Sequence, residues 1–274
     1  METLCGLFGK SKQAYYKHKR KSFSEFEIER EILSIVSIYR SEMPVIGGLK
    51  LYSLVRSVLG DAMGMGRDKF LDLLHRHKLI IPPRKSRHTT NSNHVFFKYP
   101  NLVQNLVITY ANQLWVSDIT YIYTTDDKFC YLHLVTDAFS RMIIGYVLSP
   151  TLEAKYSVQA LNQAVEASGG GNLCGTIHHS DRGVQYCSDD YVTRLKDHHI
   201  RISMTEDVNP TDNAIAERAN GIIKGEFIDP VPTPRNLQEA AALVEHAVQT
   251  YNNLRPHLSL QLRTSAEVYY DSGG

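Results

Sequence analysis

Residues 115–148 read WVSDITYIYTTDDKFCYLHLVTDAFSRMIIGYVL, and this stretch decides the fold. Its three apolar runs are rich in aromatic and β-branched residues, which is typical of strands. The runs cover residues 115–123, 129–137 and 142–148, and short polar turns separate them. Because connections this short join antiparallel neighbours, the stretch predicts a three-stranded antiparallel meander.

Downstream of the meander, helix and strand patterns alternate. Residues 153–167 have the spacing of an amphipathic helix. Short strands are expected at 176–179 and 200–204, and helices at 189–198, 212–226 and 236–254. Three strands followed by alternating helices and strands predict an α/β fold with a mixed sheet.

The first 82 residues lack strand patterns. Apolar residues recur at helical spacing over four stretches: 2–18, 25–40, 49–58 and 70–74. Arg67, Lys69 and Arg76 surround the last stretch, and a basic last helix is typical of a helix-turn-helix that binds DNA. A helical bundle whose basic side chains face water is the alternative interpretation.

Charge divides the chain in a similar way. Residues 1–100 hold 18 Lys and Arg against 9 Asp and Glu, a net of +9, and the remainder holds 12 against 20, a net of −8. A basic segment favours a polyanionic partner, because contacts with phosphate release counterions. Two solvated surfaces of opposite charge explain the same numbers without a partner.

A polar, Pro-containing linker is expected at residues 83–108. Its basic residues include Arg84, Lys85 and Arg87. These side chains could follow a phosphate backbone, and a solvated charged linker is the alternative interpretation.

Composition excludes several classes of protein. A hydrophobic fraction of 43% and a charged fraction of 22% are ordinary for globular proteins and exclude wholesale disorder. None of the four cysteines stands in a C-x-x-C pair, which excludes a zinc ribbon and a dithiol redox motif. With no signal-peptide pattern and no apolar run of about 18 residues, we expect a cytoplasmic protein without a membrane partner.

Three acidic residues occupy unusual positions. Asp118 lies inside the first apolar run, Asp181 follows the strand at 176–179, and Glu217 lies on the helix at 212–226. A buried carboxylate is costly unless it is paired or binds a cation, and two divalent cations are a common site for phosphodiester chemistry. The alternative is a chance choice of three among 29 acidic residues, each satisfied by ordinary contacts.

Five motifs occur in order along the chain. They are WVSDITY at 115–121, HSDRGVQY at 179–186, DNAIAE at 212–217, Lys224, and YNNLRPHLSL at 251–260. Together they resemble the transposases of the insertion-sequence-three family, in particular the product of the second reading frame. That family belongs to the DDE group and is similar to retroviral integrases. The resemblance implies a ribonuclease-H-like catalytic core over residues 109–274, preceded by an all-helical helix-turn-helix region over residues 1–82.

The resemblance also assigns roles to residues. Asp118, Asp181 and Glu217 match the metal-binding catalytic triad, and the 35 residues between the last two match the spacing of the group. Lys224 would contact a phosphate near the cleaved bond, with a solvated helix residue as the alternative. His179 would orient the site, or it is a packed strand histidine.

Other polar residues near these motifs have structural interpretations. Asp137 is expected to close the turn into the third strand, and Asp212 and Asn213 to cap the helix that follows. Arg255 and His257 either hold the last helix or contact DNA.

The resemblance implies a DNA transposase that cleaves element ends with water and joins the freed 3′-OH to other DNA. It implies two Mg²⁺ ions per site, with Mn²⁺ as a substitute. The implied partners are double-stranded DNA of the terminal repeats and the target, further copies in a homodimer or larger assembly, and the first-frame product. A ribonuclease-H-like nuclease or integrase with another substrate, and an inactive DNA-binding regulator, remain alternatives.

Overall fold

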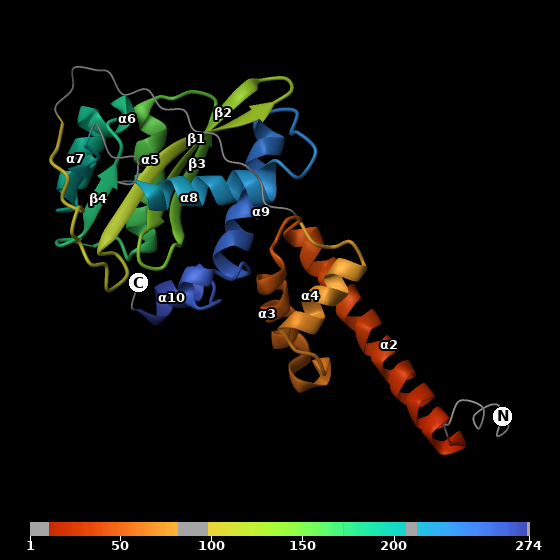
Figure 1. The fold of residues 1–274 in the computed structure, drawn as a ribbon. Coiled ribbons are helices and arrows are strands. Elements are labelled where there is room, and N and C mark those ends of the chain that lie inside the picture. The colour runs from red at the N-terminus through yellow and green to blue at the C-terminus, as the bar shows by residue number, and fades with distance from the viewer. Residues whose placement is uncertain (1–10, 82–97, 172, 207–212, 273–274) are drawn as a thin grey trace. The chain divides into compact units, whose positions relative to one another are not determined.

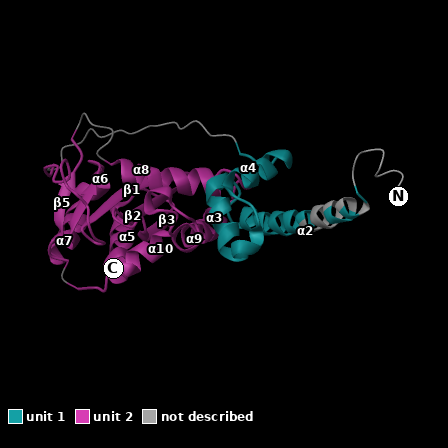
Figure 2. Ribbon diagram, turned by 60° about the horizontal axis from the view of Figure 1, so that its bottom comes forward, with its two compact units in different colours: residues 1–82 teal, residues 83–274 magenta. Residues whose placement is uncertain are grey.

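The computed structural model describes residues 11–81, 98–171, 173–206 and 213–272. The chain divides into two compact units, Met1–Pro82 and Pro83–Gly274 (Figure 2). The basic residues of the linker and the expected cap at Asp212 lie outside the described residues. None of the described helices is both long enough and apolar enough to cross a membrane.

The first unit is helical. It contains α2 (Lys12–Glu42), α3 (Gly48–Leu59), the short 3₁₀ helix η1 (Gly60–Met63) and α4 (Arg67–Arg76). Its core includes Ile32, Val36, Leu51, Phe70 and Leu74, which are fully or almost fully buried. The expectation of separate helical segments at 2–18 and 25–40 is wrong for the described part, because α2 is continuous. The polar residues at 19–24 include no Gly or Pro that would end a helix.

A five-stranded sheet organises the second unit, with the order β3-β2-β1-β4-β5 (Figure 1). The strands are β1 (Leu114–Thr124), β2 (Lys128–Asp137), β3 (Ile143–Ser149), β4 (Ile177–Ser180) and β5 (Arg201–Met204). The first three strands are antiparallel neighbours, whereas β4 pairs in parallel with both β1 and β5. The predicted meander and mixed sheet are therefore confirmed, and the strand order is that of a ribonuclease-H-like fold.

Helices cover both faces of this sheet. They are α5 (Ala154–Ala167), α6 (Val184–Cys187), α7 (Asp189–Asp197), α8 (Ala214–Ile222), the π-helix η2 (Ile223–Ile228), α9 (Leu237–Asn253), the 3₁₀ helix η3 (Leu258–Leu260) and α10 (Ser265–Asp271). On one face, Trp115 packs in a core with Leu161 of α5 and Tyr191 of α7. On the other face, Val116 packs with Ala216 of α8. Alternate residues of β1 thus serve two cores.

Close packing fixes the helix α5 against β3. A Cβ atom added at Gly145 of β3 would lie 2.1 Å from the carbonyl oxygen of Ala160. Only glycine allows the backbones to approach this closely.

Arg255 is a structural residue. It is 1% exposed, and its guanidinium donates to both carboxylate oxygens of Glu226, from Nε at 2.7 Å and from Nη2 at 2.6 Å. His257 is also buried and packs edge-on against Tyr251, with 4.9 Å between ring centroids. These contacts hold η2 against the segment that follows α9, which favours the structural interpretation of Arg255 and His257 over DNA contact.

The change Arg255→Leu is expected to lower the free energy of unfolding by about 3 kcal/mol or more, because it leaves a partly buried carboxylate without its partner. The matched control is Arg263→Leu, which removes an exposed pair with Asp271 and should cost less than about 1 kcal/mol. Denaturant unfolding of both variants measures the difference. Equal losses would show that the Arg255–Glu226 pair does not hold η2.

Candidate active site

Asp118 and Asp181 lie side by side at the point where β1 and β4 stop pairing. The parallel register places Leu114 opposite Ile177 and Ser117 opposite Ser180, with a constant offset of 63 (177 − 114). Asp118 and Asp181 are the next residues on each chain, with the same offset (181 − 118), just beyond the last pair of the ladder. Residues that keep such a register share a face of the sheet, and the negative charge of Asp181 acts on the Asp118 carboxyl group.

The electrostatics of Asp118 agree with this placement. The pKa of Asp118 is raised to about 7, mainly by burial and then by the negative charge of Asp181, with a smaller contribution from Glu217. Two hydrogen bonds oppose the shift: Asn220 Nδ2 donates to Oδ2 at 2.8 Å, and the Ile119 N–H donates to Oδ1 at 2.9 Å. A buried carboxyl group whose pKa is raised by neighbouring acids is a site that a cation would stabilise.

A tight turn holds the Asp181 carboxylate. The N–H of Gly183 donates to Oδ1 of Asp181 at 2.9 Å. A Cβ atom at position 183 would also lie 2.9 Å from that oxygen. The glycine in the sequence DRG thus allows the backbone to approach and orient the carboxylate.

Two asparagines tie α8 to β1. Asn220 lies three residues after Glu217, on the same side of the helix, and binds Asp118. Asn213 occupies the N-cap position of α8 but makes no side-chain capping bond. Its Nδ2 instead donates to the Ser117 carbonyl at 3.0 Å. The capping interpretation of the Asn213 side chain is therefore wrong, because a strand carbonyl is within its reach.

Glu217 is the least closely joined of the three acids. It lies in the first turn of α8 and makes the smallest contribution to the shifted pKa of Asp118. Within the described parts of the chain, no three His, Cys, Asp or Glu side chains together form a group that could hold a metal ion. The structure thus brings Asp118 and Asp181 together and places Glu217 on the helix attached to them.

The two histidines of β4 pack into the unit. His178 Nε2 lies 2.8 Å from Ser117 Oγ and 2.9 Å from the Tyr191 hydroxyl, and burial lowers the pKa of His178 to about 3. His179 is fully buried, and its Nδ1 lies 2.8 Å from Oγ of Ser203 in β5. The packing interpretation of His179 is supported by this contact, and its orienting role stays a prediction.

The remaining predicted residues occupy three places. Lys224 lies on η2 and lines a pocket beside β1. Arg67, Lys69 and Arg76 are exposed on α4 of the first unit, where Arg67 pairs with Asp68 and Arg76 with Glu29. The basic residues Arg84, Lys85 and Arg87 lie outside the described part of the chain.

Asp137 has the structural role expected of it. Its Oδ2 accepts hydrogen bonds from the Ser140 N–H and hydroxyl, both at 2.7 Å, and its Oδ1 accepts one from the Asn112 N–H at 2.8 Å. The carboxylate therefore closes the turn between β2 and β3, as predicted.

Comparison with known proteins gives consistent matches. The family described as "Integrase core domain" matches residues 109–210 and, in a second form, residues 198–264. A 31 kDa protein of insertion element IS600 from Shigella sonnei is 30% identical over 263 residues, which cover 94% of each chain. The transposase InsF of IS3fB from Escherichia coli K12 is 39% identical over 127 residues, 46% of this chain and 43% of InsF.

Among solved structures, the catalytic core domain of HTLV-2 integrase in complex with magnesium matches with a TM-score of 0.45 and 21% identity. The match covers 58% of this chain and 97% of that domain. The sequence relatives and the integrase core match decide the family. The chain belongs to the insertion-sequence transposases that carry an integrase core domain, and it is an enzyme of polynucleotidyl-transferase type that acts in DNA transposition.

Proposed function

We propose that this transposase is of the DDE type, with Asp118, Asp181 and Glu217 as the ligands of its catalytic metal. The observation that supports the proposal is the effect of the Asp181 charge on Asp118, two residues that directly follow the last paired residues of β4 and β1. The helix that bears Glu217 is hydrogen-bonded to Asp118 through Asn220. Glu217 completes the set when a cation attracts the three carboxylates.

The residues present fit a hard divalent cation. The ligand atoms are carboxylate oxygens, which Mg²⁺ and Mn²⁺ prefer. Burial and then the negative charge of Asp181 raise the pKa of Asp118, and a bound positive charge would oppose both effects. Next to Asp118, the side-chain oxygen of Asn220 is buried and has no hydrogen-bond partner in the structure, so it is available to a cation's water.

The chain's own residues orient the reacting groups. Two bound Mg²⁺ ions, or Mn²⁺ in their place, would activate the attacking oxygen and stabilise the leaving one. Asn220 and the Ile119 N–H hold the two oxygens of Asp118, and the Gly183 N–H holds Asp181. Lys224 binds a DNA phosphate near the cut, and buried His179 supports β4 beneath Asp181.

Two displacements at phosphorus follow from this site. In the first, water attacks the phosphorus of the phosphodiester at the element end. The P–O3′ bond breaks, the phosphate stays on the 5′ side of the neighbouring strand, and a 3′-OH is released. In the second, that 3′ oxygen attacks a phosphodiester of the target, forms a new P–O bond and releases a target 3′-OH. Each nucleophile is water or DNA, so no covalent protein–DNA intermediate is needed.

Partners follow from the same proposal. Double-stranded DNA of the element ends and of the target is the substrate, and the exposed basic residues of α4 (Arg67, Lys69 and Arg76) contact the ends. Arg84, Lys85 and Arg87 bind phosphates of the same DNA. Because two ends are joined, we expect a homodimer or larger assembly on DNA, with the first-frame product as a further partner.

The test is incubation of the whole chain with a labelled duplex of the element's own terminal DNA and a plasmid target, with MgCl₂, MnCl₂ or EDTA. We expect a nick that leaves a 3′-OH, followed by a strand joined to the plasmid, with either metal and not with EDTA. Nicking without joining would favour the nuclease alternative. Binding of the ends without nicking would favour the inactive regulator.

A further inference from the structure

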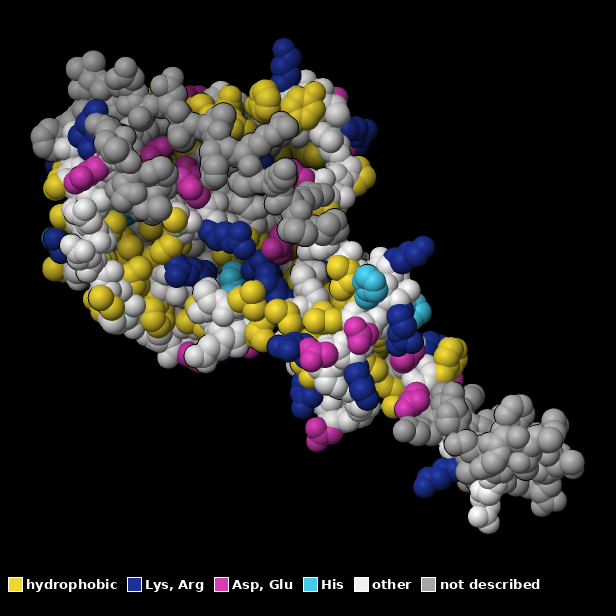
Figure 3. All heavy atoms as spheres, viewed as in Figure 1, with side chains coloured by type: hydrophobic (Ala, Val, Ile, Leu, Met, Phe, Trp, Pro, Cys, Tyr) yellow, Lys and Arg dark blue, Asp and Glu magenta, His cyan; other side chains and the backbone are white. Residues whose placement is uncertain are grey.

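Four aromatic side chains share one face at the far end of the β1–β2 hairpin. Tyr121 pairs with Tyr131 and Tyr123 with Phe129 across the strands, and each pair makes an edge-to-face contact with 5.6 Å between ring centroids. Tyr121, Tyr123 and Phe129 are 47%, 54% and 51% exposed. Figure 3 shows hydrophobic side chains gathered over this hairpin. Large aromatic residues left in water together are typical of a binding surface.

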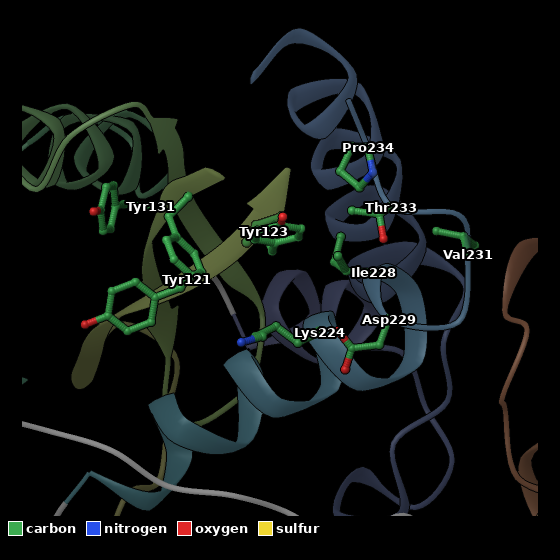
Figure 4. Close-up of a pocket in the computed structure, with 11 residues that line it drawn as sticks. Tyr121, Tyr123, Tyr131, Lys224, Ile228, Asp229, Val231, Thr233 and Pro234 are labelled. Carbon is green, nitrogen blue, oxygen red and sulfur yellow. The ribbon is translucent and has the colours of Figure 1, made fainter. Parts of the chain in front are cut away.

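A pocket of about 540 Å³ opens beside these aromatic residues (Figure 4). β4 pairs with β1 only as far as Ser117, so the outer part of β1 has η2 and residues 229–234 beside it instead of a strand. The Thr125 N–H donates to the Pro234 carbonyl at 3.1 Å, and the Asp126 N–H to the Arg235 carbonyl at 2.8 Å. These bonds tie the hairpin turn to the opposite wall, so the pocket is already formed in the free chain.

Polar groups complete the lining of the pocket. Lys224 reaches from η2 toward β1 in Figure 4, and Asp229 and Thr233 line the same space. Aromatic faces stack on bases, a lysine pairs with phosphate, and a carboxylate with a hydroxyl can accept from the amino groups of base edges. This combination favours a nucleotide over a purely apolar ligand.

The pocket lies a short distance from the carboxylates on the same two elements. Tyr121 lies three positions after Asp118 on β1, about 10 Å along the strand, and its side chain points to the opposite face of that strand. Lys224 lies seven positions after Glu217 along α8 and η2, also about 10 Å at helical rise. Since successive nucleotides of a duplex rise about 3.4 Å, both routes lead to a nucleotide roughly three steps from the cut.

We propose that this pocket binds one unpaired nucleobase of the element end, about three nucleotides from the phosphodiester bond held at the carboxylates. The proposal rests on the proposed function. Tyr121, Tyr123 and Phe129 stack on the base, Asp229 and Thr233 bind its edge, and Lys224 binds a neighbouring phosphate. Taking a base out of the stack anchors the strand in register, because a paired base cannot enter the pocket.

The test uses the whole chain and a terminal duplex in which 2-aminopurine replaces one base at a time near the cut. The variant is Tyr121→Ala with Tyr123→Ala, and Tyr123→Phe is the conservative variant. The matched control is Tyr110→Ala, because Tyr110 is 52% exposed and outside the pocket. Fluorescence reports unstacking of the probe from its neighbours, and cleavage is followed on the paired duplex and on one mismatched at the responsive position.

We expect a fluorescence change at one position, about three nucleotides from the cut, in the wild type, in Tyr123→Phe and in Tyr110→Ala. The double alanine variant should lose this signal and cut the paired duplex roughly 10- to 100-fold more slowly. A mismatch at that position should recover part of the loss, because the base is already unpaired.

Two results would overturn the proposal. In the first, the double alanine variant keeps the wild-type fluorescence signal and cleavage rate while Asp118→Asn is inactive. The pocket proposal then fails, and the proposed function stands. The other is a loss of assembly, seen by light scattering, with the fluorescence signal intact, which would make the pocket a protein interface. Failure of the proposed function can be distinguished from failure of the pocket proposal, because Asp118→Asn would then still cleave the DNA.

Discussion

Replacing Asp118 by asparagine is expected to slow end cleavage and strand joining by roughly 1,000-fold or more, because a metal-bound transition state loses several kcal/mol of stabilisation. The same loss is expected for Asp181→Asn and Glu217→Gln. Each change removes a ligand charge and keeps the size of the side chain. Single-turnover cleavage of labelled terminal DNA in Mg²⁺ measures the rate, and a gel shift in EDTA measures end binding, which should be unchanged.

Stability separates loss of ligation from loss of folding. Burial and then the negative charge of Asp181 raise the pKa of Asp118, so Asp118→Asn removes a buried charge and a repulsion in the metal-free chain. Its melting temperature without metal should therefore equal or exceed that of the wild type. The matched control is Asp190→Asn, which removes an exposed carboxylate on α7 and should keep full activity. A triad variant that retains near wild-type strand joining would remove that residue from the ligand set.

The strands of the second unit follow from local sequence. Trp115, Ile119 and Val135 lie in runs whose composition already predicts strands, and short turns leave an antiparallel meander as the simple solution. Asp118 stands out in the sequence because a carboxylate inside an apolar run needs a partner. The position of Asp181 opposite it depends on the register of a parallel pair, which no local pattern contains.

Contacts between distant segments could not be predicted in the same way. Asn220 and Asp118 are 102 residues apart in the chain, and the sequence around Asn220 does not indicate that Asp118 is its hydrogen-bond partner. One signal was available: Asn220 is a polar residue on the Glu217 side of a mostly apolar helix. The same limit applies to Arg255, whose role depends on Glu226 of η2. The sequence alone favoured a structural role for Arg255 and left DNA contact as the alternative.

The aromatic pocket also could not be predicted from the sequence. The alternation of Tyr121 and Tyr123 with Ile122 predicts a strand with two unlike faces, and an apolar ring is ordinarily expected to be buried. Exposure depends on what covers the face, and the core on the Trp115 face includes Ile119 but neither Tyr121 nor Tyr123. The extent of the elements packed on that face, rather than the composition of β1, therefore decides that the rings meet solvent.

Separating the two halves of the chain near Ser92 is expected to separate end recognition from chemistry. We propose that residues 1–90 select terminal DNA, because α4 exposes basic side chains and the first unit has its own buried core around Leu51 and Phe70. Residues 93–274 should fold and show weak, unselective nicking with metal. Specific complexes commonly exceed non-specific ones by about 1,000-fold or more, and the second fragment should lose that preference.

The measurement is a gel-shift series on terminal and scrambled duplexes at several salt concentrations, using both fragments and the whole chain. Binding by the whole chain and by residues 1–90 should weaken steeply with salt, because each phosphate contact releases counterions. Lys69→Glu should weaken end binding, whereas the matched control Lys196→Glu, an exposed lysine of α7 in the other unit, should affect it much less. If residues 93–274 alone prefer the terminal duplex as strongly as the whole chain does, recognition lies in the catalytic unit, and the basic face of α4 serves another purpose.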